Sequence, residues 1–353
     1  MIDNNSKEFI YRHIGPSEAE QKKMLKAIGY NSLDELMKNT VPEKILLKEE
    51  LNIEEPLSEN DALKKLKNIS KQNKIFRNFI GMGYYNSFTP NVILRNIFEN
   101  PGWYTSYTPY QPEVAQGRLE MLLNFQQLII DLSGMDIANA SLLDEATAAA
   151  EAVGLSQRLD KDNSKKIFVS SSCNPQTIDL IKTRTEPFGL ELIIGDEKND
   201  LQKIKENIVC GILSYPGTLG DIQDPSESIS QIHKKKGKAI LICDLLALTR
   251  LKTPGELGAD IAVGSAQRFG IPMGYGGPHA AFFATKEEFK RSMPGRIIGV
   301  SVDRHGKKAY RLSLQTREQH IRRDKATSNI CTAQALLAII SAAFAMYHGP
   351  EGL

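Results

Sequence analysis

The chain has 353 residues, of which 41% are hydrophobic and 24% are charged, a composition typical of a globular protein. Its formal net charge of +2 gives no strong attraction to nucleic acid or to an anionic membrane. No run approaches the roughly 20 consecutive apolar residues of a membrane-spanning helix, so we expect neither nucleic acid nor membrane as a partner. The length suits one large domain and part of a second.

The cysteines and the N-terminus bear on the cellular compartment. The four cysteines form no Cys-x-x-Cys pair and no Cys/His cluster with zinc spacing, so we expect no metal site. Cys210 and Cys243 stand in apolar runs, and these two, like Cys331, are expected to be buried thiols, which favours a reducing compartment. The first residues lack the basic and apolar regions of a secretory signal and are too acidic for a typical transit peptide.

Residues 1–75 are rich in lysine and carry short helical patterns. Ser17 followed by Glu20 is a capping box, and Ser32 followed by Glu35 repeats the pattern. Because the apolar residues here are too few for a separate core, we predict a helical arm that clasps a larger body.

Residues 102–118 hold the only tryptophan of the chain and three of its eleven tyrosines. Pro109 and Pro112 fix φ and remove two backbone donors, so this segment cannot form an interior helix or a central strand. A rigid loop that presents hydroxyls, amides and one guanidinium suits a small polar ligand. A loop packed on itself is the alternative.

Regular elements follow this loop. Residues 116–132 form a helical pattern with a stop signal at Ser133-Gly134, and residues 144–157 form an alanine-rich one. Short apolar runs then alternate with helical patterns, which predicts βαβ units and a mainly parallel sheet buried on both faces. The runs are residues 166–170, 190–194, 208–213, 239–243, 261–263 and 280–284.

The last helical pattern covers residues 327–347, and the chain ends shortly after it. We therefore predict a helical arm at residues 1–75 and a large α/β domain at residues 76–326. Residues 327–353 are expected to begin a C-terminal small domain that is incomplete.

The start of the alanine-rich helix is a candidate binding site. Parallel-sheet proteins bind ligands at the carboxyl ends of strands, beside helix N-termini. Thr147 and its small neighbours resemble a phosphate seat, because free backbone N–H groups and the helix dipole attract anions. Asp144 and Glu145 argue against this, since two carboxylates repel a phosphate. N-capping by Asp144 and ligand binding therefore both stay open.

Asp244 follows the apolar run at residues 239–243. In pyridoxal-phosphate enzymes of the aspartate-aminotransferase type, an aspartate at this place pairs with the pyridinium nitrogen, and a lysine after the next strand forms the Schiff base. Here that position holds Gln267 or Arg268, and an arginine that stays protonated is a poor imine-forming amine. Lys286 opens a charged segment and is expected at the surface. The cofactor fold is predicted, but its covalent anchor is missing.

Residues 314–331 form a long polar and basic segment. Its arginines suit a carboxylate or a partner surface, with an ion-pair network as the alternative. They are Arg317, Arg322 and Arg323. Thr327, Ser328 and Asn329 either cap the last helix or line a pocket. His320 has no acid–base partner in the sequence and is expected to be structural.

Long motifs across nearly the whole chain resemble the N-terminal half of the glycine cleavage system P-protein family, the decarboxylating glycine dehydrogenases. These motifs are Arg12-His-Ile-Gly-Pro16, residues 79–85, 100–113, 137–151, Ser265-Ala-Gln-Arg-Phe-Gly270 and residues 315–323. The first of them resembles the long, single-chain form of the family.

The resemblance implies an α/β fold of the pyridoxal-phosphate-dependent transferase type (fold type I). It implies two homologous halves, with the Schiff-base lysine and most of the pyridoxal phosphate contacts in the C-terminal half or partner subunit. The complete enzyme decarboxylates glycine and passes the aminomethyl group to the lipoyl H-protein. The assembly is expected to be a dimer of halves or a homodimer of full chains, in the bacterial cytoplasm or, in a eukaryote, the mitochondrial matrix.

Carried over to this chain, the resemblance implies residues that border the active site and degenerate cofactor positions, and no catalytic residue. The border residues are Tyr104, Tyr107, Tyr110, Gln111, Arg118, Thr327, Ser328 and Asn329. The degenerate positions are Thr147, Asp244, Gln267 and Arg268. Residues 1–353 alone are expected to be inactive. Two alternatives are a self-contained pyridoxal-phosphate transferase that uses another lysine, such as Lys286, and a non-catalytic docking subunit for the lipoyl carrier.

Overall fold

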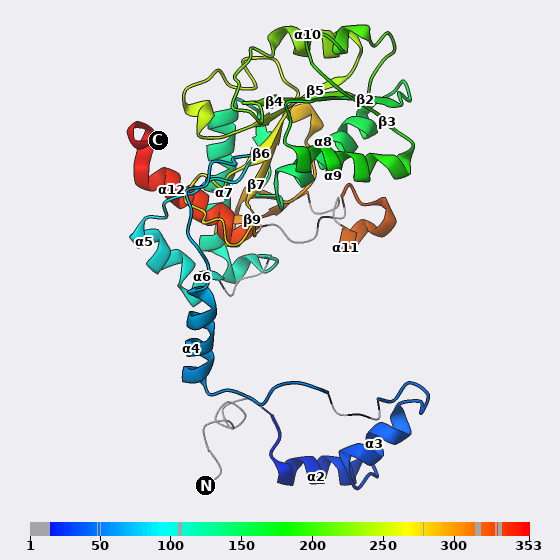
Figure 1. The fold of residues 1–353 in the computed structure, drawn as a ribbon, viewed down its shortest axis with the longest axis vertical. Coiled ribbons are helices and arrows are strands. Elements are labelled where there is room, and N and C mark those ends of the chain that lie inside the picture. The colour runs from blue at the N-terminus through cyan, green and yellow to red at the C-terminus, as the bar shows by residue number, and fades with distance from the viewer. Residues whose placement is uncertain are drawn as a thin grey trace. The chain divides into compact units, whose positions relative to one another are not determined.

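A computed structural model describes residues 15–47, 49, 51–104, 108–277, 279–314, 319–328, 330 and 334–353. The chain divides into two compact units, Met1–Asn78 and Phe79–Leu353, which are drawn in Figure 1. Four residues discussed above lie outside the described residues: Tyr107, Arg317, Asn329 and Cys331.

In the described part of the first unit, the helices are α2 (Glu18–Ala27), α3 (Leu33–Thr40) and α4 (Glu59–Ser70). The capping box that begins α2 is confirmed. The backbone N–H of Glu20 donates to Ser17 Oγ at 3.4 Å, and the N–H of Ser17 donates to Glu20 Oε2 at 2.7 Å. Two backbone donors at this helix end are therefore satisfied by side chains.

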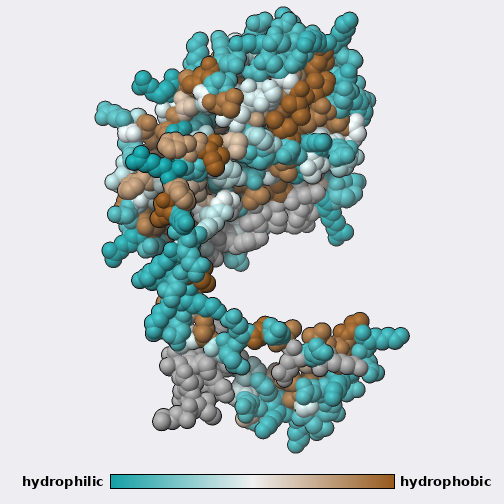
Figure 2. Space-filling model, in the orientation of Figure 1, coloured by the Kyte–Doolittle hydropathy of each residue, from teal (hydrophilic) through white to brown (hydrophobic). Residues whose placement is uncertain are grey.

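The predicted repeat of this box at α3 is only half correct. The N–H of Glu35 donates to Ser32 Oγ at 3.1 Å, but the Glu35 carboxylate accepts from the N–H of Asn31, at 2.8 Å. Neither α3 nor α4 buries a residue. Figure 2 shows hydrophobic side chains at the surface of this unit, and they include Ile45, Leu47, Leu51 and Ile53. Among the described residues of this unit, Leu25 is the only buried hydrophobic side chain.

The second unit is built on a seven-stranded sheet with the order β1-β7-β6-β5-β4-β2-β3. Strands β2 to β6 are parallel, and β7 is antiparallel to β6 and to β1. The strands are β1 (Ile137–Ala138), β2 (Lys166–Ser170), β3 (Glu191–Gly195), β4 (Cys210–Tyr215), β5 (Lys238–Cys243), β6 (Ile261–Ser265) and β7 (Ala281–Thr285). The six predicted runs are thus confirmed to within two residues, and β1 was missed.

Helices cover both faces of this sheet (Figure 1). The longer helices are α7 (Gln116–Ser133), α8 (Glu145–Leu159), α9 (Pro175–Thr185), α10 (Ser226–Lys234) and α12 (Ala335–Gly352). Shorter ones are α5 (Asn91–Ile93), η1 (Leu94–Phe98), α6 (Pro101–Tyr104), η2 (Pro112–Val114), η3 (Glu186–Phe188), η4 (Leu201–Lys203), η5 (Ala247–Thr249), η6 (Glu287–Phe289), α11 (Gln319–Arg322) and η8 (Arg323–Lys325). No helix in the described ranges combines the length and apolarity that crossing a membrane requires.

Alternate residues of β5 enter opposite cores. Leu241 packs in one hydrophobic cluster with residues of α7, α10 and α12, whereas Ile240 and Ile242 pack in another with residues of α8 and α9. This follows from the period of two along a strand, and it explains why the runs are apolar throughout rather than alternating. The buried thiols include Cys210 and Cys243, as predicted, and burial raises the pKa of both.

A two-stranded hairpin was not predicted. Strands β8 (Ile297–Val302) and β9 (Lys308–Ser313) pair in antiparallel fashion, and α7 holds them through its glutamines. The N–H of Ile298 donates to Gln126 Oε1 at 2.7 Å, and the N–H of Tyr310 donates to Gln116 Oε1 at 2.9 Å.

The last helix begins later than predicted. Its N-cap is Gln334, so the expected capping by Thr327 and Ser328 is wrong. Instead, Ser328 Oγ accepts from the N–H of Ile330 at 3.2 Å. Residues of α12 such as Ile340 belong to the same core cluster as α7.

Candidate functional site

A cavity of about 270 Å³ opens where β4, β5 and β6 end. Its lining includes Ser214 at the end of β4, Cys243 at the end of β5 and Ser265 at the end of β6. Parallel sheets commonly bind ligands at this edge, because the strand ends and the helix N-termini meet there. Three of the predicted degenerate positions, Asp244, Gln267 and Arg268, also line the cavity.

Asp244 is held by donors of the protein itself. Arg268 Nη1 donates to Asp244 Oδ2 in a close ion pair. The N–H of Leu246 donates to Asp244 Oδ1 at 2.8 Å. The Arg268 guanidinium also lies over the Tyr85 ring, 5.2 Å from its centroid. The carboxylate expected to face a pyridinium nitrogen is therefore paired with an arginine.

Gln267 is buried and ties the Tyr85 segment to the sheet. Its Nε2 donates to the backbone oxygens of Tyr85 and Ile271, both at 2.7 Å. Its Oε1 accepts from the N–H of Tyr85 at 3.4 Å. The Gln267 amide thus both donates and accepts hydrogen bonds. A lysine at this position could not do both, since an ammonium only donates.

Two carboxyl groups occupy the start of α8. Asp144 is its N-cap and accepts from the N–H of Thr147 at 2.8 Å. Glu145 Oε1 accepts from Asn174 Nδ2 and from Thr177 Oγ1, each at 2.9 Å. Burial raises the pKa of Glu145, and the charges of Asp144 and Asp244 raise it further. Thr147 is therefore part of an acidic helix start.

These residues do not fit pyridoxal phosphate. The lysine position holds Gln267, the aspartate is paired with Arg268, and the helix start that would face the phosphate carries Asp144 and Glu145. Two carboxylates oppose a phosphate dianion, and no residue at the strand end can form an imine.

A second cavity of about 230 Å³ adjoins the first, since Gly83, Glu145 and Ser265 line both. Asp144 and His279 also line the second cavity. His279 is 5% exposed and its ring lies edge-on to that of Tyr84, with centroids 4.9 Å apart. Burial lowers the pKa of His279, so its imidazole is neutral near pH 7.

Tyr104 and Tyr110, the described tyrosines of the loop at residues 102–118, lie elsewhere. Tyr110 contacts Arg296, whose Nη2 donates to the phenol oxygen at 2.6 Å and whose guanidinium lies 5.2 Å from the ring centroid. Tyr104 ends α6 and is exposed. Gln111 is exposed before η2, and Arg118 is half-buried in the first turn of α7.

Arg296 also joins two other predicted residues. A small cavity of about 20 Å³ is lined by Arg296, Thr327 and Ser328, together with residues 293–295 and Ile330. The structure therefore gathers Tyr110, Thr327 and Ser328 around one buried arginine that the sequence reasoning missed. The one available signal was its place after Pro294-Gly295, just before an apolar strand.

The remaining predicted residues that the structure describes lie outside both cavities at the strand ends. None of Tyr104, Gln111 and Arg118 is among the described residues that line them. Arg322 and Arg323 are exposed. Sequence reasoning also missed Asn174, Tyr85 and His279 as lining residues, although the quoted motif at residues 79–85 contains Tyr85.

Lys286 lies at the other edge of the sheet. Its Nζ is 2.5 Å from Oδ1 of Asp260, which directly precedes β6. Asp244, Gln267 and Arg268 follow the ends of β5 and β6, so the sheet separates Lys286 from them. This placement argues against Lys286 as an imine-forming lysine of the strand-end cavity.

Comparisons with known proteins agree on the family. The model of the glycine cleavage system P-protein matches residues 11–353. The "Glycine dehydrogenase (decarboxylating)" of Pelagibacter ubique is 76% identical over the whole chain, and that of Nostoc is 59% identical over 98% of it. The chain spans only 37% and 35% of the length of these two relatives.

Solved structures agree on the fold. A crystal structure of glycine decarboxylase (P-protein) of the glycine cleavage system, in inhibitor-bound form, superimposes with a TM-score of 0.88 and 36% identity. The superposition covers 96% of this chain and 78% of that one. A sphingosine-1-phosphate lyase from Burkholderia pseudomallei shares the fold alone, with a TM-score of 0.57, 14% identity and 87% of this chain covered. The predicted fold class is confirmed.

Proposed function

The chain belongs to the glycine cleavage system P-protein family, and from this we propose that it is the half of a decarboxylating glycine dehydrogenase that lacks the Schiff-base lysine. The complete enzyme would decarboxylate glycine with pyridoxal phosphate, held mainly by the remaining polypeptide or a partner subunit, and pass the aminomethyl group to the lipoyl H-protein. The relatives' names and the much greater length of their chains support this proposal.

The observation that carries the proposal is the environment of Gln267. Its buried amide bonds the backbone of Tyr85 and Ile271 at the place where a fold of this type carries its lysine. Asp244 is paired with Arg268 in addition. A side chain whose amide is fully used in backbone hydrogen bonds suits a structural role. The Schiff base would then form in another part of the enzyme.

We propose that this half supplies part of the border of the active site. Tyr104, Tyr107, Tyr110, Gln111 and Arg118 would face the other half, and Thr327, Ser328 and Asn329 would lie beside them. The support is the cluster around Arg296, which fixes the Tyr110 phenol and shares a cavity with Thr327 and Ser328. A phenol held by a guanidinium has a set orientation, and this suits contact with a small polar substrate.

Bacterial relatives and buried free thiols, such as Cys210, favour the reducing cytoplasm of a bacterium as the place where the enzyme works. A helical arm at residues 1–75, a large domain at residues 76–326 and the beginning of a small domain at residues 327–353 remain our proposed division of the polypeptide.

Reconstitution tests the proposed function. The 353-residue chain alone should release no labelled carbon dioxide from carboxyl-labelled glycine, and borohydride with pyridoxal phosphate should trap no lysine in peptide maps. Addition of the remaining segment of the Pelagibacter ubique relative, with lipoyl H-protein, should produce turnover. Release by the chain alone, or a trapped Lys286, would contradict the assignment.

A further inference from the structure

The two cavities at the strand ends are lined by carboxyl groups. Among the described residues that line them, the carboxyl groups are Asp144, Glu145 and Asp244. The one guanidinium is that of Arg268, and it is already paired with Asp244. Asp144 and Glu145, at the start of α8, are therefore the carboxyl groups that no lining cation pairs with among these described residues.

Glu145 has an acceptor atom to spare. Both of its protein donors, Asn174 Nδ2 and Thr177 Oγ1, reach the same oxygen, Oε1. Within the described part of the chain, Oε2 receives no hydrogen bond. A carboxylate can accept at both oxygens, so this one retains capacity for a donor in the cavity.

His279 supplies an independent sign of a missing donor. The residue is 5% exposed, lines the second cavity, and its Nε2 has no hydrogen-bond partner among the described residues. Buried polar atoms without partners are rare, because the loss of hydration is not compensated. A neutral imidazole accepts at one nitrogen, and Nε2 is the acceptor when Nδ1 carries the proton.

A ligand that satisfies these groups must donate hydrogen bonds and carry positive charge. A ligand with a phosphate or carboxylate and no ammonium group would be repelled by Asp144 and Glu145. The cavity of about 230 Å³ has room for several non-hydrogen atoms, given roughly 30 Å³ for each water molecule in the liquid. A primary ammonium with three donors matches the available acceptors.

We propose that the strand-end recess of this half binds a small molecule with a primary ammonium group, which lies between Glu145 and His279 in place of a phosphorylated cofactor. The ammonium donates to Glu145 Oε2 and His279 Nε2, with Asp144 as a further negative neighbour. Two classes of small molecule carry such a primary ammonium group: amines and amino acids. The inference goes beyond the proposed function and holds whether or not the complete enzyme acts on glycine.

Isothermal titration calorimetry of the 353-residue chain tests the site with ethylammonium chloride as the probe. Tetramethylammonium chloride is the control, since it carries the same charge without an N–H donor. Ethylammonium should bind with a stoichiometry of one, and tetramethylammonium should bind at least about tenfold more weakly, because hydrogen bonds to a charged group are lost. Equal affinity for both probes, or no binding of ethylammonium, would overturn the proposal.

Variants locate the site. Glu145→Gln should weaken ethylammonium binding about tenfold or more, and His279→Phe about fivefold, by the loss of one charged and one neutral acceptor. The matched control is Asp162→Asn, which alters an exposed carboxylate paired with Lys236 before β2 and should leave the affinity unchanged. Unchanged affinity in Glu145→Gln, with normal folding by circular dichroism, would place the ammonium elsewhere and overturn the proposal.

Glycine in the same titration distinguishes the two sources. Tighter binding of glycine than of ethylammonium identifies an amino acid as the ligand, and the reverse identifies an amine; both support an ammonium site. The measurement uses the chain alone, so it is separate from the reconstitution that tests the proposed function.

Discussion

The two edges of the central sheet each bury a carboxyl group, and the two groups have opposite surroundings. At the amino edge, Asp260 lies 2.5 Å from Lys286 Nζ and 2.8 Å from His233 Nε2, and it accepts from the N–H of Ala239 at 2.9 Å. At the carboxyl edge, the donors to Glu145 among the described residues are the neutral groups of Asn174 and Thr177.

The pKa values of these two carboxyls shift in opposite directions. Burial raises both, but for Asp260 the hydrogen bonds from Lys286, Ala239 and His233 outweigh it, so its pKa is lowered. For Glu145, burial and the neighbouring aspartates leave the pKa raised. At the amino edge, the protein's own cations therefore pair with the buried carboxylate. At the carboxyl edge, Glu145 retains a hydrogen-bond acceptor that a ligand can use.

The largest expected effect is that of Asp260→Ala. We expect the free energy of unfolding in urea to fall by about 3 kcal/mol, the lower end for breaking a buried ion pair, since Lys286 and His233 are partly exposed and can be rehydrated. Asp162→Ala, which removes an exposed pair with Lys236, should cost much less. Equal losses of unfolding free energy in the two variants would mean that the buried Asp260 pairs stabilise the fold no more than an exposed pair does.

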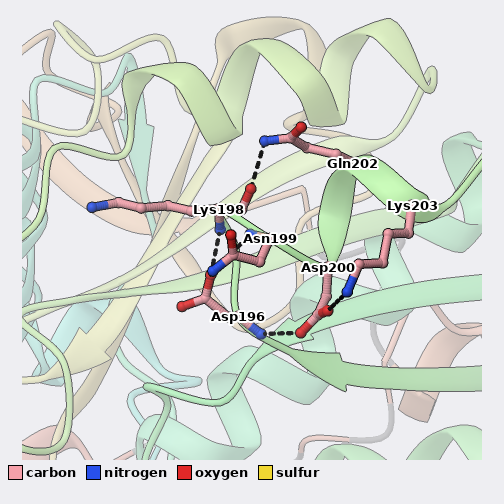
Figure 3. A network of polar contacts seen from close by, with 6 residues as sticks. All are labelled: Asp196, Lys198, Asn199, Asp200, Gln202 and Lys203. Atoms are coloured by element: carbon pink, nitrogen blue, oxygen red, sulfur yellow. Dashed lines mark hydrogen bonds and ion pairs between the residues drawn. The ribbon is translucent and has the colours of Figure 1, made fainter.

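Gln267→Leu at the carboxyl edge should cost about 2 kcal/mol, because the carbonyls of Tyr85 and Ile271 lose their donor inside the protein. Denaturation monitored by circular dichroism measures it. The matched control is Gln202→Leu in the surface turn after β3, where Gln202 donates to the backbone of Lys198 at 2.5 Å (Figure 3). That change should cost less than about 0.5 kcal/mol. A smaller loss for Gln267→Leu than for the control would refute the anchoring role.

The contributions of Asp260 and Glu145 to the free energy of unfolding should depend on pH in opposite directions. A lowered pKa means that Asp260 stabilises the fold above the ordinary pKa of aspartate, and that this stability is lost as pH falls through the folded-state value. A raised pKa means that the folded protein holds the Glu145 proton longer, so stability declines as pH rises above the ordinary value for glutamate.

Glu145→Gln should therefore gain stability relative to the unmodified chain as pH rises from about 4 to about 8. Urea denaturation at several pH values measures this difference. A difference that is constant with pH, or one that shrinks, would show that Glu145 is not destabilised by its surroundings.

The smallest effect is expected for Lys203→Ala. Its ion pair with Asp200 is solvent-exposed, so the loss should stay within about 0.5 kcal/mol. Asp200→Ala should cost more, because Asp200 also accepts from the N–H of Asp196 at 2.9 Å (Figure 3). Thermal unfolding compares the two, and a larger loss for the lysine variant would contradict this order.

Local pattern was sufficient to predict the parallel strands. The range of β2 agrees at both ends, because the apolar run Ile167-Phe168-Val169 lies between polar residues on either side. The β8–β9 hairpin escaped prediction since Val300 and Val302 are exposed and its position depends on Gln126 and Gln116, far away in the sequence. Hydrogen bonds between residues so far apart in the sequence depend on the tertiary fold, and local patterns do not reveal them.

The same distinction applies to the site. Asp244, Gln267 and Arg268 were predicted because they directly follow strand ends. Arg296 and His279 were not, since their roles come from contacts with Tyr110 and Tyr84 across the fold. Resemblance to the family supplied the border residues, but it could not separate those that meet around Arg296 from those that do not.

The pairing of β1 with β7 has a consequence for synthesis on the ribosome. Ile137 pairs with Thr285, so a strand made early waits for a partner made about 150 residues later, whereas β2 and β3 can pair almost as soon as they emerge. The apolar stripe of α7, just before β1, waits longer still, because α12 of the same core cluster is made after β7. The growing polypeptide is therefore exposed to association with other chains until β7 and α12 leave the exit tunnel.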